Sequence, residues 1–264
     1  MAGARQWMGR LMLRIPDSLR SVRNLPGVGG VVHRLSHWAL PDSEKVWAQI
    51  ESGPAKGLWM ELNPRTGQNC LRGDAEPAVQ ERLVSLLRAG MTFYDLGANI
   101  GYYSLLAARL AGPDGRVFSF EPNPEVAARL RRNLARNRFE NATVTEAGVW
   151  SSSGLVTFVP SNADSPDQAT GRFAAGDNVA GTPVRCVALD DFVAAAPAPE
   201  GMKCDVEGAE VEVLRGAERM LRSRRPWILA EMHSPENDQA WREFLGRLDY
   251  TFETVDCNHI LARP

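Results

Sequence analysis

The sequence lacks the features that mark several large classes of protein. Its 30 basic and 32 acidic side chains give a net charge of −2, so the chain has no overall field suited to nucleic acid. No run approaches the roughly 18 consecutive apolar residues of a membrane-spanning helix. The four cysteines are scattered without a C-x-x-C spacing, which argues against a zinc site or disulfide framework and favours reduced thiols in a cytoplasmic protein.

The most informative segment is residues 91–101, where a buried-strand run breaks into a glycine turn that opens a helix. Glycine lacks a Cβ atom, so the backbone can turn sharply and lie close to a ligand at the free N–H groups of the helix. The spacing is not the G-x-G-x-x-G of a dinucleotide site. An acid followed by two glycines suits a ligand with an ammonium group, such as S-adenosylmethionine. The predicted cofactor-binding residues of the turn are Asp95, Gly97, Ala98, Asn99 and Gly101.

A second acid, Glu121, ends a predicted strand over residues 116–120 and follows Gly101 by 20 residues. In a doubly wound sheet this spacing places a carboxylate at the tip of the neighbouring strand, where it can accept hydrogen bonds from both ribose hydroxyls of an adenosyl group. Pro124 opens the next helix, so an acid here is also compatible with an ordinary helix start. The turn and the acid together favour an adenosyl ligand.

These motifs resemble the FkbM family of S-adenosylmethionine-dependent methyltransferases, and the resemblance runs from about residue 45 to the C-terminus. Further segments that carry it are 73–77, 120–122, 202–210, 213–216 and 231–233. The resemblance implies a class I methyltransferase fold, S-adenosylmethionine as cofactor and a hydroxyl group as methyl acceptor. It also implies that Glu76 and Asn123 bind the cofactor.

The alternation of apolar patterns predicts an α/β doubly wound sheet over residues 76–264, behind an N-terminal helical extension over residues 1–75. Helices are expected over 76–88, 102–111, 124–137, 208–222 and 236–247, with Gly216 interrupting the fourth. Strands are expected over 91–95, 116–120, 142–146, 201–206, 226–232, 250–256 and 259–263. The last two form a hairpin, so one of them is antiparallel to the rest of the sheet.

Residues 150–188 interrupt this alternation. Predicted strands over 155–159 and 184–188 flank a polar stretch, which indicates a hairpin insertion whose tip is either a lid that recognises the acceptor or a plain loop. Just before it, Ala147 and Gly148 are small enough to admit an adenine ring.

Three residues at the ends of two predicted strands are the candidate catalytic group: Asp205, Glu231 and His233. The carboxyl ends of parallel strands meet at one edge of a sheet, so we expect these side chains to converge. His233 is the candidate general base, because imidazole titrates near neutrality, with Glu231 or Asp205 fixing its orientation. Alternatively, the three hold a divalent cation such as Mg²⁺ that orients two acceptor hydroxyls. A purely structural role for His233 also remains open.

Two charged neighbours of this group receive other predictions. Glu210 opens a helix, where a carboxylate is favourable, and we expect it to be structural. Lys203 is one of three lysines in the chain and is expected to pair with Asp205 or Glu231, or to reach solvent.

The first residues predict an amphipathic helix. Arg10 and Arg14 fall on one face, and the apolar face comprises Trp7, Met8, Leu11, Met12 and Ile15. Such a helix can contact a membrane surface or cover an active site, whereas packing on the domain or on a second subunit of a homo-oligomer is the plainer alternative. Arginines interrupt each apolar run and no cleavage site follows, so a signal peptide is not expected. A further helix is predicted to include residues 44–50.

The residues and the resemblance together predict an S-adenosylmethionine-dependent O-methyltransferase that acts on a hydroxyl of a small-molecule natural product, sugar or glycan. The acceptor class comes from the resemblance alone. A non-catalytic binding or scaffold protein on a methyltransferase fold is the alternative. A NAD-dependent oxidoreductase is disfavoured by the glycine spacing and the terminal hairpin, and a nucleic-acid methyltransferase by the lack of a basic patch with stacking aromatics.

Overall fold

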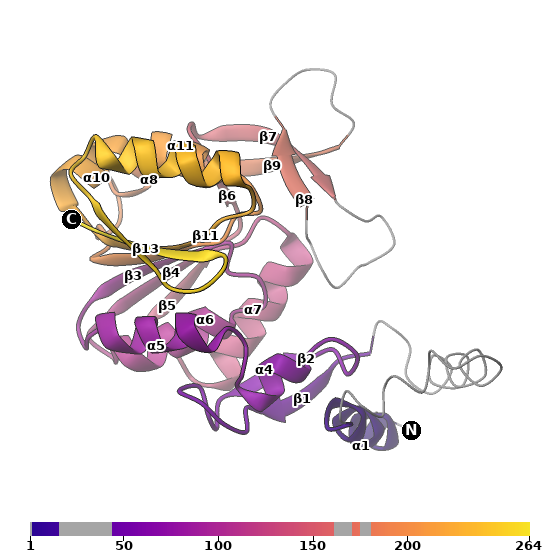
Figure 1. Ribbon diagram of the computed structural model, residues 1–264. Coiled ribbons are helices and arrows are strands. Elements are labelled where there is room, and N and C mark those ends of the chain that lie inside the picture. The colour runs from indigo at the N-terminus through magenta and orange to yellow at the C-terminus, as the bar shows by residue number, and fades with distance from the viewer. Residues whose placement is uncertain (1, 16–43, 161–170, 175–180) are drawn as a thin grey trace. The chain divides into compact units, whose positions relative to one another are not determined.

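The computed structural model describes residues 2–15, 44–160, 171–174 and 181–264 (Figure 1). The chain divides into two compact units, Met1–Ala75 and Glu76–Pro264. No helix within the described ranges is long and apolar enough to cross a membrane.

The larger unit is built on a seven-stranded sheet. In spatial order its strands are β12 (Thr251–Thr254), β13 (His259–Arg263), β11 (Trp227–Glu231), β10 (Gly201–Cys204), β3 (Thr92–Leu96), β4 (Arg116–Phe120) and β5 (Ala142–Thr145). Strand β13 is antiparallel to both of its neighbours, while β11, β10, β3, β4 and β5 are parallel. The predicted class I methyltransferase-like sheet with an antiparallel terminal hairpin is therefore confirmed. Its strand order reverses between β3 and β10, where sheets of this kind bind ligands.

Helices cover both faces of this sheet (Figure 1). Helices α5 (Pro77–Leu86), α6 (Tyr102–Ala111) and α7 (Pro124–Arg136) lie on one face, and α8 (Leu189–Phe192), α10 (Glu218–Arg224) and α11 (Pro235–Gly246) lie on the other. The predicted helix over 208–222 is divided at Gly216 into α9 (Glu210–Arg215) and α10, as that glycine suggested. A Cβ atom on Gly216 would lie 2.1 Å from the carbonyl oxygen of Trp150, so this approach requires glycine.

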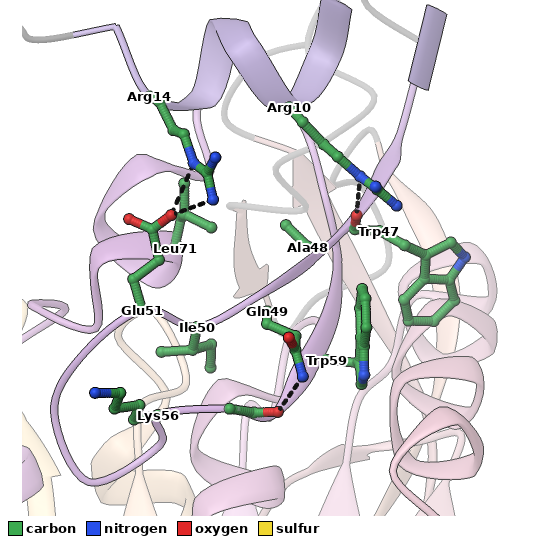
Figure 2. A pocket seen from close by; sticks show the side chains of 11 residues that line it. Arg10, Arg14, Trp47, Ala48, Gln49, Ile50, Glu51, Lys56, Trp59 and Leu71 are labelled. Atoms are coloured by element: carbon green, nitrogen blue, oxygen red, sulfur yellow. Dashed lines mark hydrogen bonds and ion pairs between the residues drawn. The ribbon is translucent and has the colours of Figure 1, made fainter. Parts of the chain in front are cut away.

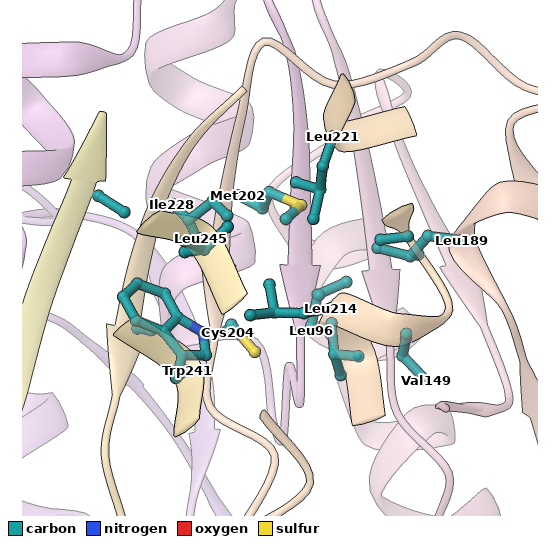
Figure 3. Close-up of a cluster of buried hydrophobic side chains, with 14 of the residues drawn as sticks. Leu96, Val149, Leu189, Met202, Cys204, Leu214, Leu221, Ile228, Trp241 and Leu245 are labelled. Atoms are coloured by element: carbon teal, nitrogen blue, oxygen red, sulfur yellow. The ribbon is translucent and has the colours of Figure 1, made fainter. Parts of the chain in front are cut away.

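The core between the sheet and the second helical layer is continuous and apolar (Figure 3). Every residue of β3 and β10 is buried, as expected for central parallel strands covered on both faces. Trp241 of α11 is fully buried against this layer. The central strands are thus rigidly placed, and so are the residues that follow their carboxyl ends.

The insertion after β5 forms a small separate sheet. Its strands are β6 (Gly148–Val149), β7 (Gly154–Pro160), β8 (Gly171–Ala174) and β9 (Thr182–Val187), in the order β6-β9-β7-β8. The expected hairpin corresponds to the antiparallel pair β7 and β9, whereas β8 was not predicted. Residues 161–170 and 175–180 lie outside the described part of the chain, and the proposed lid or recognition role of this tip stays a prediction.

The smaller unit contains α1 (Ala2–Leu13), an antiparallel pair of strands β1 (Val46–Gln49) and β2 (Trp59–Leu62), and α4 (Gln68–Arg72). The helix predicted over residues 44–50 is wrong, because this segment is strand β1. Val46, Ala48 and Ile50 are buried while the residues between them are more exposed. This two-residue period is the signal of a half-buried strand.

Helix α1 packs on β1 with a different face from the one predicted. Leu13 is buried, Arg14 pairs with Glu51, and Arg10 donates a hydrogen bond from Nε to the carbonyl oxygen of Trp47 at 2.8 Å. Trp7 and Leu11, which belong to the predicted apolar face, are 65% and 53% exposed. The guanidinium groups turn toward β1 because acceptor oxygens lie there. A membrane or oligomer contact through the exposed apolar pair stays a prediction.

A pocket of about 420 Å³ lies within this smaller unit (Figure 2). Its lining includes the two arginines of α1 and the indole rings of the strand pair: Arg10, Arg14, Trp47 and Trp59. Arg14 and Arg10 already bind Glu51 and a backbone carbonyl, so these contacts hold α1 against the strands.

Gly97 joins β3 to the turn, and its replacement tests how tightly the central strands approach each other. Its φ is +78°, and a Cβ atom there would lie 1.8 Å from the carbonyl oxygen of Asp205. We expect Gly97→Ala to lower the free energy of unfolding by about 3 kcal/mol or more, because left-handed strain adds to a clash with backbone. Gly90→Ala is the matched control, with φ +84° and no atom within 4 Å, and should cost about 1 kcal/mol. If urea unfolding shows that both variants lose the same free energy of unfolding, this account is contradicted.

Candidate active site

The glycine turn after β3 is anchored to the neighbouring strand. The amides of Gly97 and Ala98 both donate hydrogen bonds to the carbonyl oxygen of Phe120, at 3.1 and 2.9 Å. Asn99 adopts a left-handed conformation with φ 48°, and Gly101 with φ 91° caps the start of α6. A Cβ atom on Gly101 would lie 2.1 Å from a methyl carbon of Leu130. Both predicted glycine positions therefore need glycine.

Asp95 lies beneath this turn. Its side chain is 1% exposed, and Oδ2 accepts a hydrogen bond from the Ser104 hydroxyl at 2.5 Å. The Ser104 oxygen in turn accepts a hydrogen bond from Ser119 at 2.8 Å. Burial raises the pKa of Asp95, while the charge of Lys203 and the Ser104 bond oppose the rise. The carboxylate thus ties β3, β4 and α6 together under the turn, and contact with a ligand would have to come through the backbone above it.

Glu121 lies where the sequence places it, at the end of β4. It is 5% exposed, and its two oxygens accept hydrogen bonds from the amides of Asn99 at 2.9 Å and Asn123 at 2.8 Å. Burial raises the pKa of Glu121 to about 7, against the effect of these two bonds. A carboxylate has about four acceptor positions, so lone pairs remain for two hydroxyl groups.

The other predicted cofactor residues near Glu121 have local roles as well. The Asn123 side chain caps α7 by accepting hydrogen bonds from the amides of Glu125 and Val126. Ala147 is fully buried, and Gly148 begins β6. Their small size is consistent with the predicted adenine position.

Lys203 and Asp205 form a close ion pair at the end of β10. The ammonium lies 2.8 Å from Oδ2 of Asp205 and 4.8 Å from the centre of the Tyr103 ring, and the lysine side chain is 3% exposed. Burial raises the pKa of Asp205, but the charge of Lys203 and its hydrogen bond bring it below its ordinary value. The predicted pairing of Lys203 with Asp205 is confirmed.

His233 is held by a residue other than those predicted. Its Nδ1 lies 2.8 Å from Oε1 of Glu210, whose side chain is fully buried. Its Nε2 lies 3.5 Å from Glu207 and 3.7 Å from Asp205. Glu210 also accepts hydrogen bonds from the Gly208 amide and the Asn237 side chain. The carboxylate that orients the His233 ring is therefore Glu210. Glu210 begins α9 and His233 follows β11, and folding of the sheet brings these two segments together.

This hydrogen bond changes the protonation of His233. The bond with Glu210 raises the pKa of His233 to about 9, against burial, and the charges of Glu210, Asp205 and Glu207 add to the rise. Below that pH the ring is mostly an imidazolium that donates from both nitrogens.

The three predicted catalytic residues do converge. Asp205, Glu231 and His233 each offer a ligand atom within 4.8 Å of the others. Burial and the charge of Asp205 raise the pKa of Glu231. His259, which sequence reasoning missed, lies 3.7 Å from Glu231 as its register partner across β11 and β13. The pairing of the terminal hairpin is the signal that could have found it.

The groups at this edge of the sheet fit S-adenosylmethionine. That molecule carries positive sulfonium and ammonium groups and a ribose with two hydroxyls. The edge offers buried carboxylates at Asp95 and Glu121 and a half-buried one at Asp205, beside the buried ammonium of Lys203. A backbone turn that leaves no room for side chains at Gly97 and Gly101 lies beside them.

Comparison with known proteins agrees with this geometry. The model of the methyltransferase FkbM domain matches residues 95–253. The hexuronic acid methyltransferase AglP of Haloferax volcanii is 34% identical over 169 residues, which is 62% of this chain and 65% of that protein. The 31-O-demethyl-FK506 methyltransferase FkbM of Streptomyces tacrolimicus is 34% identical over 123 residues, 46% of this chain and 42% of that protein. The chain thus spans less than two thirds of either relative.

Among solved structures, a methyltransferase FkbM from Methylobacillus flagellatus is similar with a TM-score of 0.48 and 20% identity, over 71% of this chain and 53% of that one. The domain match covers more than half of the present sequence, and it includes the turn, Glu121 and the Asp205–His233 region. The chain therefore belongs to the FkbM family of S-adenosylmethionine-dependent methyltransferases.

Proposed function

We propose that this protein transfers the methyl group of S-adenosylmethionine to a hydroxyl oxygen of a sugar, glycan or other small-molecule natural product. The observation that carries the proposal is the convergence of Asp205, Glu231 and His233 beside the glycine turn. A hydroxyl is a poor nucleophile until its proton is removed, so a methyltransferase acting on oxygen needs a basic group at this place.

The acceptor class is supported by the two relatives. One is named for a hexuronic acid, which is a sugar carrying hydroxyl and carboxylate groups, and the other for the 31-oxygen of demethyl-FK506. Both names describe hydroxylated small molecules or sugars. The proposal takes a hydroxyl of this chemical class as the methyl acceptor.

The cofactor would be held along the carboxyl ends of β3 and β4. Bound S-adenosylmethionine supplies a methyl group on a positive sulfur, which makes the methyl carbon electrophilic. The turn from Gly97 to Gly101 would lie along the bound cofactor. Glu121 would accept hydrogen bonds from the ribose hydroxyls, and Ala147 with Gly148 would flank the adenine. Asn123 completes the proposed set, whereas Oε2 of Glu76 accepts a hydrogen bond from the Tyr103 hydroxyl and lies 3.8 Å from His259.

His233 is proposed as the group that takes the proton of the acceptor hydroxyl, at Nε2. Glu210 binds Nδ1, so Nε2 is the nitrogen left to face Asp205 and Glu207. A cation held by Asp205, Glu231 and His233 would have to displace both the Lys203 ammonium and the imidazolium proton, which weighs against the magnesium alternative at this position.

Binding of S-adenosylhomocysteine should depend on the charge of Glu121. Only the carboxylate form accepts hydrogen bonds from both ribose hydroxyls, and its pKa of about 7 predicts that affinity weakens as the pH falls from 8 to 6. Glu121→Gln should weaken binding roughly 10–100-fold at pH 8 and remove the pH dependence, since a bond to a charged acceptor is worth about 1.5–3 kcal/mol. Isothermal calorimetry at three pH values checks this. The exposed variant Glu140→Gln is the control, and an unchanged affinity in Glu121→Gln would contradict the ribose assignment.

Replacing His233 should impair turnover without impairing cofactor binding. We expect His233→Gln to lower kcat about 100-fold or more, the usual contribution of a general base, with S-adenosylhomocysteine affinity unchanged within a factor of two. Mass spectrometry of hexuronic acid glycosides tested as acceptors gives the rate. Full turnover by His233→Gln would assign the base to another group, and cofactor binding with no methylation of any acceptor would favour the scaffold alternative.

Glu210→Gln tests the orienting bond separately. In the wild-type protein kcat/KM should rise with pH toward about 9, because the imidazolium must lose its proton to act as a base. Without the Glu210 carboxylate the rise should move to lower pH, since that bond is the largest cause of the raised pKa of His233. An unchanged pH profile in this variant would mean that His233 is not the titrating base.

A further inference from the structure

A second cluster of ligand-type side chains lies beside the proposed active site in the larger unit. Glu76, Glu231 and His259 each offer one atom within 4.8 Å of the others. Nε2 of His259 lies 3.7 Å from Oε2 of Glu231 and 3.8 Å from Oε2 of Glu76. These separations are too long for hydrogen bonds and leave space between the three atoms.

The His259 ring is the observation that points to a missing ligand. Its side chain is 5% exposed, and Nε2 has no hydrogen-bond partner within the described part of the chain. A buried polar atom without a partner is costly, so such atoms are rare unless an ion or water satisfies them. This atom is aimed at two carboxylates.

The opposite side of the ring is already fixed. Nδ1 of His259 lies 2.8 and 3.0 Å from the two carboxylate oxygens of Asp256. In the neutral ring, a carboxylate that accepts from Nδ1 leaves the lone pair on Nε2, which is the arrangement found around metal-binding histidines. The lone pair would then face two anionic groups, and a cation between them removes the repulsion.

Both carboxylates are also placed for this role. Glu76 stands at the N-terminal end of α5 with φ 46°, a left-handed conformation that is strained in a residue with a side chain, and it makes no capping hydrogen bond. Instead its Oε2 accepts a hydrogen bond from the Tyr103 hydroxyl at 2.7 Å. Glu231 is 22% exposed at the end of β11.

We propose that Glu76, Glu231 and His259 bind a divalent transition-metal ion of the Mn²⁺ or Zn²⁺ type. Two carboxylates and one imidazole are a mixed oxygen and nitrogen set that suits these ions, and three protein ligands leave further positions open. In an octahedral site, adjacent ligand atoms at about 2.2 Å from the metal lie about 3.1 Å apart, so the two carboxylate oxygens would each move roughly 0.6 Å closer to Nε2 of His259.

The open positions would take oxygen atoms of the acceptor, such as a hydroxyl and the neighbouring carboxylate of a sugar acid. This step rests on the proposed function, because Glu231 belongs to both clusters and so places the ion next to His233. Metal binding itself does not depend on methyl transfer and is measured without any acceptor.

The test titrates Mn²⁺ into the full-length, chelator-treated protein and follows the electron paramagnetic resonance signal of the unbound ion, with Zn²⁺ as competitor. The wild-type protein should show saturable single-site binding. Glu76→Gln and His259→Gln should each weaken it tenfold or more, and Asp256→Asn about 10–100-fold through the orientation of the ring. His233→Gln and the exposed variant Glu140→Gln should bind within a factor of two of wild type.

The outcomes separate the proposal from its rivals. Saturable binding that is lost in His233→Gln but kept in His259→Gln would place the ion at Asp205, Glu231 and His233 and overturn the proposal. Absence of saturable Mn²⁺ or Zn²⁺ binding by the wild-type protein would overturn it as well. Circular dichroism of each variant confirms folding, and Glu76, which is 38% exposed, can be replaced without removing a buried side chain. Methylation that proceeds without bound metal would leave the proposed function intact.

Discussion

The ion pair between Lys203 and Asp205 is the interaction on which the carboxyl edge of the sheet depends. Lys203 is the buried cation in a region where Asp95, Asp205 and Glu76 all act on its charge. Burial lowers the pKa of Lys203, and these three carboxylates raise it above its ordinary value. Removing one partner of a buried pair typically costs about 3–5 kcal/mol, because the other charge is left uncompensated. The lysine therefore permits several acids to gather at one edge.

Two of the groups with raised pKa values, Glu121 and His233, lie in different parts of the site. Glu121 lies on the β4 side, where the proposed cofactor needs an acceptor of hydrogen bonds, and its pKa rises because of burial. His233 lies on the β11 side, where its pKa rises because Glu210 binds the protonated ring. Perturbed groups whose shifts have separate physical causes are typical of active sites. The sheet positions them on opposite sides of the point between β3 and β10 where the strand order reverses.

Much of the larger unit could be predicted because local patterns decide it. Helix α6 and strand β4 have the predicted bounds, and the antiparallel β13 follows from the terminal hairpin. The prediction of a helix over 44–50 was wrong, because so short a segment has too few residues to distinguish the 3.6-residue period of a helix from the two-residue period of a strand. Packing in the folded unit makes this segment a strand. The contacts Glu210–His233 and Glu76–His259 could not be predicted, since they join segments brought together only by strand register and helix placement.

The most direct test of the account is calorimetric titration of the purified protein with S-adenosylhomocysteine, with NAD and NADP in parallel. The account predicts binding of S-adenosylhomocysteine at micromolar or better affinity and no binding of either dinucleotide, because the turn lacks the dinucleotide glycine spacing and Glu121 is proposed to accept hydrogen bonds from an adenosyl ribose. A folded protein that binds none of the three, or that binds a dinucleotide instead, would contradict it.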